Sequence, residues 1–147
     1  MSDAIFTENC TQCDRCIDAC ETKILTRDNE GFPVVDFDKG ECTFCTACHQ
    51  VCDQSNNLLQ PADARHALKP WSLVLSISAE CLAKNKVFCQ SCRDVCESNA
   101  IDFSYFLAGK TNSIPQPTIN ADDCTQCGAC IAGCPQSAIA FRPNETI

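Results

Sequence analysis

The sequence of 147 residues has little of what most enzymes and nucleic-acid-binding proteins display. It holds only five glycines, and neither a phosphate-binding glycine loop nor a nicotinamide or flavin fingerprint can be recognised. No nucleophile stands at a readable spacing from a base. Eleven lysines and arginines are set against nineteen aspartates and glutamates, which gives a net charge of −8 and argues against nucleic acid as a natural partner. We therefore expect no catalytic site, and a partner protein with a basic face.

Long apolar runs are also missing. The best candidate, residues 73–79, is interrupted by serine and is far shorter than the roughly 20 residues that a membrane-spanning helix needs. The first residues show no basic n-region, no apolar h-region and no twin arginine, so no export route is visible. These absences predict a soluble, cytoplasmic protein without a membrane span, and a monomer is the simplest expectation.

Cysteine, by contrast, is abundant: there are sixteen, all placed in four runs. Three runs have the spacing C-x-x-C-x-x-C-x-x-x-C, and the third run has its first interval widened to seven residues. The fourth run is followed by Pro135, as in bacterial ferredoxins. The four runs are Cys10, Cys13, Cys16 and Cys20; Cys42, Cys45, Cys48 and Cys52; Cys81, Cys89, Cys92 and Cys96; and Cys124, Cys127, Cys130 and Cys134.

This spacing indicates iron–sulfur chemistry. Three closely spaced thiolates on a tight loop can hold three corners of a four-iron cube, and the fourth cysteine, which we expect at the start of a short helix, reaches a neighbouring cube. A disulfide scaffold and zinc sites are the alternatives, but disulfides suit exported proteins and paired zinc ligands normally stand well apart. We therefore predict four [4Fe-4S] clusters. Because the cysteines are then spent as ligands, few apolar residues remain for a core, and folding should be coupled to metal binding.

The distances between runs predict the architecture. We expect an α+β fold of two tandem bacterial-type two-cluster ferredoxin modules, residues 1–60 and 71–147, joined by a connector at residues 61–70. In two-cluster ferredoxins the fourth cysteine of each run ligates the other cluster. The predicted ligand sets are Cys10, Cys13, Cys16 and Cys52 (cluster 1); Cys42, Cys45, Cys48 and Cys20 (cluster 2); Cys81, Cys89, Cys92 and Cys134 (cluster 3); and Cys124, Cys127, Cys130 and Cys96 (cluster 4).

Short strands and one helix are expected between the runs. Each module should contain a hairpin, whose return strand is short, irregular or at an edge because Pro33, Pro115 and Pro117 cannot donate a ladder hydrogen bond. The expected elements are hairpins of residues 24–26 with 32–37 and of 100–105 with 114–119, a strand at 71–77 pairing with 138–141, a pairing of residues 5–7 with Leu58 and Leu59, and a helix at 61–68.

Charged residues replace the ferredoxin proline after the other three runs. Glu21, Asp53 and Glu97 stand there, and each would put negative charge near a cluster. Arg15 and Arg93, inside the first and third runs, could offset some of that charge. Solvated surface residues are the alternative interpretation. The widened interval of the third run is either a docking element or a longer route to the same ligand geometry.

The whole chain from Cys10 onward resembles the ferredoxin-type NapF family of the bacterial periplasmic nitrate reductase system. The segments that carry the resemblance are Cys81-Leu82-Ala83, residues 87–97, and the closing run with Cys134-Pro135. The resemblance implies a cytoplasmic accessory protein that meets the molybdenum-containing catalytic subunit, NapA, before export. Its implied task is maturation of that subunit by supply of electrons or of cluster.

Two other functions are compatible with the same ligands. One is a general electron carrier between soluble redox partners, and another is a detached electron-transfer subunit of a larger oxidoreductase. Metal ligation is common to all three, and function then depends on the docking surface and the partner.

Overall fold

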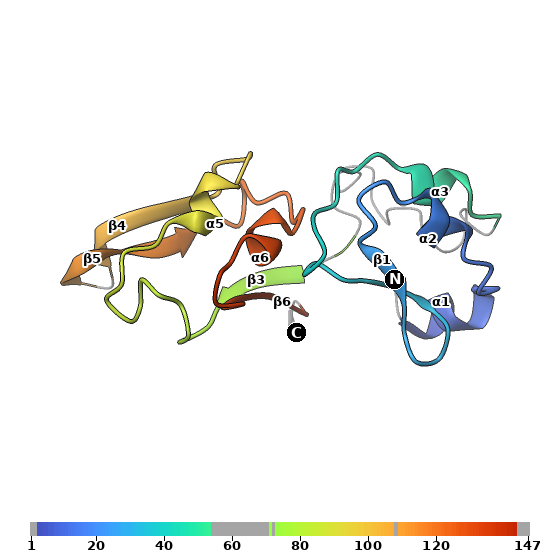
Figure 1. Ribbon diagram of the computed structural model, residues 1–147, viewed down its shortest axis with the longest axis horizontal. Helices are drawn as coiled ribbons and strands as arrows, with labels where there is room; N and C mark the ends of the chain where they lie inside the picture. The colour runs from blue at the N-terminus through green and yellow to red at the C-terminus, as the bar shows by residue number, and fades with distance from the viewer. Residues whose placement is uncertain (1–2, 54–70, 72, 108, 144–147) are drawn as a thin grey trace. The chain divides into compact units, whose positions relative to one another are not determined.

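The computed structural model describes residues 3–53, 71, 73–107 and 109–143. The chain divides into two compact units, Met1–Pro70 and Trp71–Ile147 (Figure 1). Each unit contains two of the cysteine runs.

The described part of the first unit combines three short helices with one hairpin. Helix α2 contacts both α3 and β1, so the two helices and the hairpin form one cluster of elements. The hairpin is antiparallel, with Leu25 opposite Val35. The described elements of this unit, in chain order, are α1 (Asp3–Asn9), α2 (Arg15–Ala19), β1 (Leu25–Arg27), β2 (Pro33–Val35) and α3 (Ala47–Gln50).

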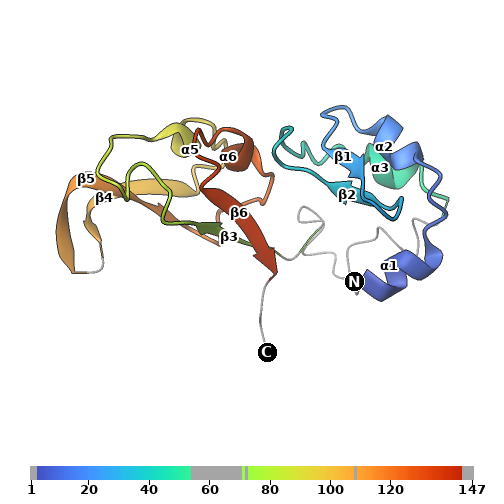
Figure 2. The ribbon, with the colours of Figure 1, turned by 60° about the horizontal axis from the view of Figure 1, so that its bottom comes forward.

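Over residues 71, 73–107 and 109–143, the second unit has two helices and two separate two-stranded antiparallel sheets. Its elements are β3 (Leu73–Ile77), α5 (Ser91–Asp94), β4 (Ile101–Leu107), β5 (Lys110–Ile119), α6 (Ala129–Ala132) and β6 (Ile139–Pro143). One sheet pairs β3 with β6, and the other pairs β4 with β5. Helices α5 and α6 lie side by side, α5 against β4 and α6 against β6 (Figure 2). Among the described residues, no helix combines the length and the apolar character needed to cross a bilayer.

The expected hairpins and the pairing of the first strand with the last strand of this unit are confirmed. In the β3–β6 sheet Ile77 lies opposite Ile139. Strand β5 runs for ten residues through two prolines, and Pro117 pairs with Phe103. A two-stranded sheet has only edge strands, so a residue without an N–H group leaves its gap on the outward side, where no ladder partner is needed. The β4–β5 register shifts between Ser104 and Phe106.

The expected pairing of residues 5–7 as a strand is wrong. These residues lie in α1, and the N–H of Cys10 donates to the carbonyl of Phe6 at 2.9 Å. A seven-residue helix pairs its backbone N–H and C=O groups through such local hydrogen bonds. A three-residue strand would instead need a partner strand for the same groups. Leu58, Leu59 and the expected helix at 61–68 lie outside the described residues.

The apolar core is small. Among the described residues, nine of the aliphatic and cysteine types are buried, together with Pro115, Pro117 and Gly128, and no polar or charged residue is. Ile24 is the one in the first unit, and the others belong to the second unit: Ala83, Cys92, Ala100, Ile101, Cys130, Ile131, Ala138 and Ile139. Two of the nine are cysteines, so the core of the second unit is built around its cysteine runs.

Candidate iron–sulfur sites

Each cysteine run folds into a one-turn helix that contains its third cysteine. Cys16, Cys48, Cys92 and Cys130 lie in α2, α3, α5 and α6 respectively. The fourth cysteine lies at or just after the end of that helix, which corrects the expectation that it opens one. The reason is the spacing: three residues between the third and fourth cysteines complete one turn. The N–H of Cys20 and that of Cys134 close this turn on the carbonyls of Ile17 and Ile131, at 3.2 and 3.1 Å.

The backbone of the runs is unusual because many residues are left-handed. Nine described residues other than glycine have positive φ angles, and every one lies inside a run or three residues after its last cysteine. They are Gln12, Asp14, Lys23, Phe44, Thr46, Lys86, Asn99, Gln126 and Ser137. Gly128 takes the same conformation in the fourth run, with φ of 89°. Sequence reasoning missed this feature. Gly128 is of the residue type that signals it most clearly, and Asp14 and Asn99 are of types that tolerate it, but the other residues give no such sign.

This conformation has a direct chemical use. A left-handed backbone conformation costs free energy when the residue has a bulky side chain, as Phe44 does. Because this conformation recurs at equivalent positions of the runs, it indicates a functional constraint. Turns that combine right-handed and left-handed residues turn successive N–H groups into one concavity, which binds anions and iron–sulfur groups. The N–H of Phe44 donates to the sulfur of Cys42 at 3.4 Å, and that of Ala138 donates to the sulfur of Cys134 at 3.3 Å.

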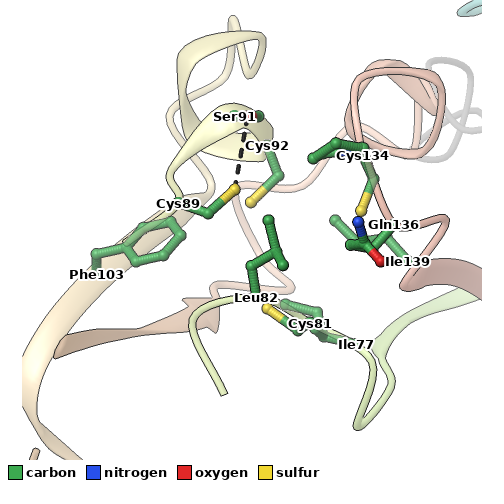
Figure 3. Close-up of a pocket in the computed structure, with 11 residues that line it drawn as sticks. Ile77, Cys81, Leu82, Cys89, Ser91, Cys92, Phe103, Cys134, Gln136 and Ile139 are labelled. Carbon is green, nitrogen blue, oxygen red and sulfur yellow. Dashed lines mark hydrogen bonds between the residues drawn. The ribbon is translucent and has the colours of Figure 1, made fainter. Parts of the chain in front are cut away.

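In the second unit, four cysteines from distant parts of the chain line one hollow. Cys81, Cys89, Cys92 and Cys134 surround a space of about 350 Å³. Figure 3 shows their sulfur atoms turned toward the same space, with Leu82 reaching between them and the Phe103 ring beside Cys89. These are the four residues of the third predicted ligand set.

A second hollow in this unit gathers the other four cysteines. Cys96, Cys124, Cys127 and Cys130 line a space of about 310 Å³, together with apolar residues such as Phe141. In each of the two hollows, three cysteines come from one run and the fourth from the other run. The two runs of this unit are therefore interlocked, with each fourth cysteine crossing to its partner run.

In the first unit, the cysteines that lie close together can be recognised because their sulfurs change the pKa of one another's thiols. Burial raises the pKa of Cys42 and of Cys48, and the nearby sulfurs of Cys20 and Cys45 raise both further, so these four cysteines form one group. Cys10 and Cys13 act in the same way on Cys16. The segment that carries Cys52 contacts the run of Cys10, Cys13 and Cys16 through Asp53, the residue after Cys52.

That link is an ion pair between the two runs of the first unit. The guanidinium Nη1 of Arg15 donates to the Oδ2 atom of Asp53 at 2.6 Å. The arginine therefore does offset one of the three carboxylates, as the sequence suggested. A second ion pair joins Asp14, the preceding residue, to Arg27 of β1. Both residues between Cys13 and Cys16 are thus used to tie the first run to its surroundings.

The titration of the thiols follows their burial. Burial raises the pKa of Cys92 to about 11 and that of Cys130 to about 12, and the nearby cysteine sulfurs add to both shifts. For Cys20, burial also raises the pKa, but hydrogen bonds from the Leu25 backbone N–H and the Thr22 hydroxyl outweigh it and the net pKa is lowered. Ligands bind iron as thiolates, so loading the buried positions must expel tightly held protons.

The widened interval of the third run is an ordered turn. Ala83 is fully buried, and its carbonyl accepts a hydrogen bond of 2.7 Å from the amide of Gln116 in β5. The amide of Asn85 donates to the carbonyls of Ala79 and Cys81. These bonds hold Cys81 at the hollow of Figure 3, so the longer interval does serve as a route to that position.

The donor set fits iron–sulfur clusters better than the alternatives. All sixteen cysteines are described, and none forms a disulfide. In the described part of the chain, no three Cys, His, Asp or Glu side chains converge on the position of a single metal ion, as four thiolates at about 2.3 Å from zinc would have to. A cube presents a separate iron atom to each sulfur and so suits a wider arrangement of donors. When bound, such clusters accept and donate single electrons.

Comparison with known proteins agrees with this geometry. The family model for the 4Fe-4S dicluster domain matches residues 9–56 and 87–138. The ferredoxin-type protein NapF of Escherichia coli (strain K12) is 46% identical over 134 residues, which cover 91% of this chain and 76% of the relative. The chain belongs to the NapF family of ferredoxin-type proteins. It is thus an iron–sulfur protein with a dicluster domain matched twice along its length.

Two further relatives place the family in a wider group. The ferredoxin-type protein NapF of Haemophilus influenzae is 42% identical over 142 residues, 97% of this chain and 75% of the relative. A component of the ion-translocating oxidoreductase complex of Methanosarcina acetivorans is 34% identical over 138 residues, 92% of this chain but only 48% of that component.

Proposed function

We propose that this chain binds four [4Fe-4S] clusters, one in each of the four ligand sets given above, in two tandem modules at residues 1–60 and 71–147. The two hollows of the second unit, each lined by three cysteines of one run and one of the other, support the exchange of ligands between runs. The shared backbone conformation of the runs extends the same argument to the first unit. About sixteen iron atoms per chain are then expected.

Cysteine substitution tests the ligand sets. Cys20→Ala should unseat the cluster held by Cys42, Cys45 and Cys48 and leave the cluster of its own run in place. We expect a loss of about four iron atoms per chain in anaerobic iron and sulfide analysis. Cys52→Ala is the matched variant, since it should unseat the other cluster. The two variants should therefore differ in the paramagnetic resonance signal that disappears, and identical spectra would contradict the exchange.

We propose further that the protein acts in the cytoplasmic maturation of the periplasmic nitrate reductase catalytic subunit, NapA, by supplying electrons or cluster. The observation that supports this function is the 46% identity to the ferredoxin-type protein NapF over 91% of the chain. The acidic charge of the chain, which bound clusters would increase, favours a partner with a basic docking face. On this proposal the chain is an electron-transfer and maturation protein without a catalytic site of its own, and it works as a monomer.

Binding and genetics together test this proposal. Immobilised iron-loaded protein should retain the nitrate reductase catalytic subunit from a cytoplasmic extract at low salt and release it at high salt, because charge attraction is screened. A strain that lacks the protein should make catalytic subunit with less activity and less iron. Full activity and full cluster content in that strain would exclude the maturation role.

A second function, general electron transfer between soluble redox partners, is favoured by the similarity to the component of an ion-translocating oxidoreductase complex. Under this alternative the extract would yield a reductase or dehydrogenase in place of the nitrate reductase subunit. Electron transfer to that enzyme, measured as reduction of the isolated proteins after mixing, would then be fast.

A further inference from the structure

Three of the four final cysteines are anchored by a buried apolar residue that follows them. Ile24, Ala100 and Ala138 stand four residues after Cys20, Cys96 and Cys134, and each is only 2% exposed. The anchoring also involves the backbone. The carbonyls of these three residues accept hydrogen bonds of 2.7, 2.8 and 2.8 Å from Asp36, Asn120 and Ser78 respectively. Each of these cysteines is therefore held by burial and by a backbone bond that salt does not screen.

Cys52 differs from the other three already in the sequence. Asn56 and Asn57 occupy the positions four and five residues after it, where the others have Ile24-Leu25, Ala100-Ile101 and Ala138-Ile139. Asparagine side chains are polar and gain little from burial, so the sequence does not supply the apolar anchor that follows the other three cysteines.

What the structure describes at Cys52 is an ion pair. Asp53, directly after Cys52, pairs at 2.6 Å with Arg15, which lies between Cys13 and Cys16. The contact therefore joins the segment that carries the fourth predicted ligand of cluster 1 to the run that carries the other three. Both side chains are largely exposed, 56% for Arg15 and 73% for Asp53. Exposed ion pairs contribute little, and salt screens them.

We propose that Arg15 and Asp53 are positioning residues that close the site formed by Cys10, Cys13, Cys16 and Cys52, and that this site is the first to lose iron when the salt concentration rises. The inference rests on the ligand sets proposed above. It follows from a difference among the described residues: the other three final cysteines are followed by buried apolar side chains, which salt does not weaken, whereas the contact described after Cys52 is one of charge.

The test measures the rate of iron release to a chelator from the full-length, anaerobically loaded protein. At about 0.1 M salt, Arg15→Ala and Asp53→Asn should each release one cluster's share of iron about two- to fivefold faster than the unmodified protein. At about 1 M salt the difference should vanish, because the pair is then screened in all proteins. The reversed pair, Arg15→Asp with Asp53→Arg, should restore the slow rate at low salt.

Two controls make the outcome specific. Glu97→Gln changes the carboxylate that follows Cys96, for which no ion pair exists among the described residues, and it should leave the rate unchanged. In a Cys52→Ala protein, Arg15→Ala should cause no further acceleration, because the site it closes is already lost.

The outcomes separate the two proposals. Unchanged release from both Arg15→Ala and Asp53→Asn would overturn the positioning role while leaving the ligand sets intact. Equal acceleration by Glu97→Gln, or failure of the reversed pair, would also overturn it. Full iron content in Cys52→Ala would instead overturn the ligand set, and the positioning role with it.

Discussion

At the scale of single residues, Gly133 shows how closely the two runs of the second unit pack. It lies between Cys130 and Cys134, and a Cβ atom added there would come within 3.0 Å of the Cγ2 atom of Val95 and 3.2 Å of the Ala129 carbonyl oxygen. Its φ angle of −78° is open to any residue, so the constraint is space and not backbone conformation. Val95 directly precedes Cys96, so any displacement passes to a predicted ligand of cluster 4, the set that also contains Cys130.

We therefore expect Gly133→Ala to destabilise the iron-loaded protein by about 1–3 kcal/mol, the usual cost of overpacking. The measurement is the midpoint of thermal unfolding under anaerobic conditions, with release of iron recorded in parallel. Adding Val95→Ala should recover most of the loss, because it removes the methyl group that the new Cβ meets. An unchanged midpoint in the single variant would show that Val95 moves aside at no cost.

At the scale of elements, the turn between Cys81 and Cys89 depends on one contact from β5. Gln116 donates to the carbonyl of the fully buried Ala83. The same carbonyl also accepts a hydrogen bond of 3.2 Å from the N–H of Lys86. Gln116→Leu keeps the side-chain size but removes the shorter of these two bonds, which costs about 0.5–1.5 kcal/mol. We expect the third predicted cluster to release its iron faster, as measured by iron analysis and by the resonance signal of that cluster.

A neighbouring substitution on the same strand serves as the control for Gln116→Leu. Thr118→Val removes only an exposed hydroxyl bond, 3.4 Å long, to the carbonyl of Asp102. Since water can replace that partner, we expect the iron of all sites to be released at the normal rate. If the two variants behaved alike, the buried bond to Ala83 would not be what holds the turn.

The elements also show what a sequence can and cannot predict here. Strand pairs with many cross-strand contacts, such as β3 with β6, follow from alternation of apolar residues along the chain. The helix at residues 5–7 could not be predicted in this way, because a three-residue pattern is too short to distinguish a strand from a helical turn. Left-handed conformations at Asp14 and Thr46 were missed for another reason, since the cluster site imposes them on residues whose own preference is different.

At the scale of the whole molecule, the small apolar core of the described residues leads us to expect that bound iron is the main source of stability. In the described part of the first unit Ile24 alone is buried, while the described part of the second unit buries eight aliphatic and cysteine residues as well as Pro115, Pro117 and Gly128. We expect removal of iron by a chelator and a reductant to abolish most of the far-ultraviolet circular dichroism. Hydrogen exchange should then show the backbone of the first unit losing protection before that of the second.

The opposite result would be decisive. A colourless, iron-free preparation that remained well folded would show that the polypeptide stabilises itself, and a zinc or disulfide scaffold would become the better explanation of sixteen cysteines. Equal loss of protection in the two units would show that the core of the second unit adds nothing beyond its iron.

The single tryptophan of the chain stands next to the fourth run. The indole Nε1–H of Trp71 donates to the carbonyl of Gln126 at 3.0 Å, and the amide of Gln126 donates in turn to the carbonyl of Leu73 at 2.7 Å. Because iron–sulfur groups absorb strongly and quench nearby fluorophores, a cluster bound at Cys124 and Cys127 would quench the emission of this indole. Loss of the proposed cluster there should therefore raise the fluorescence of Trp71, which reports on the fourth run without an added label.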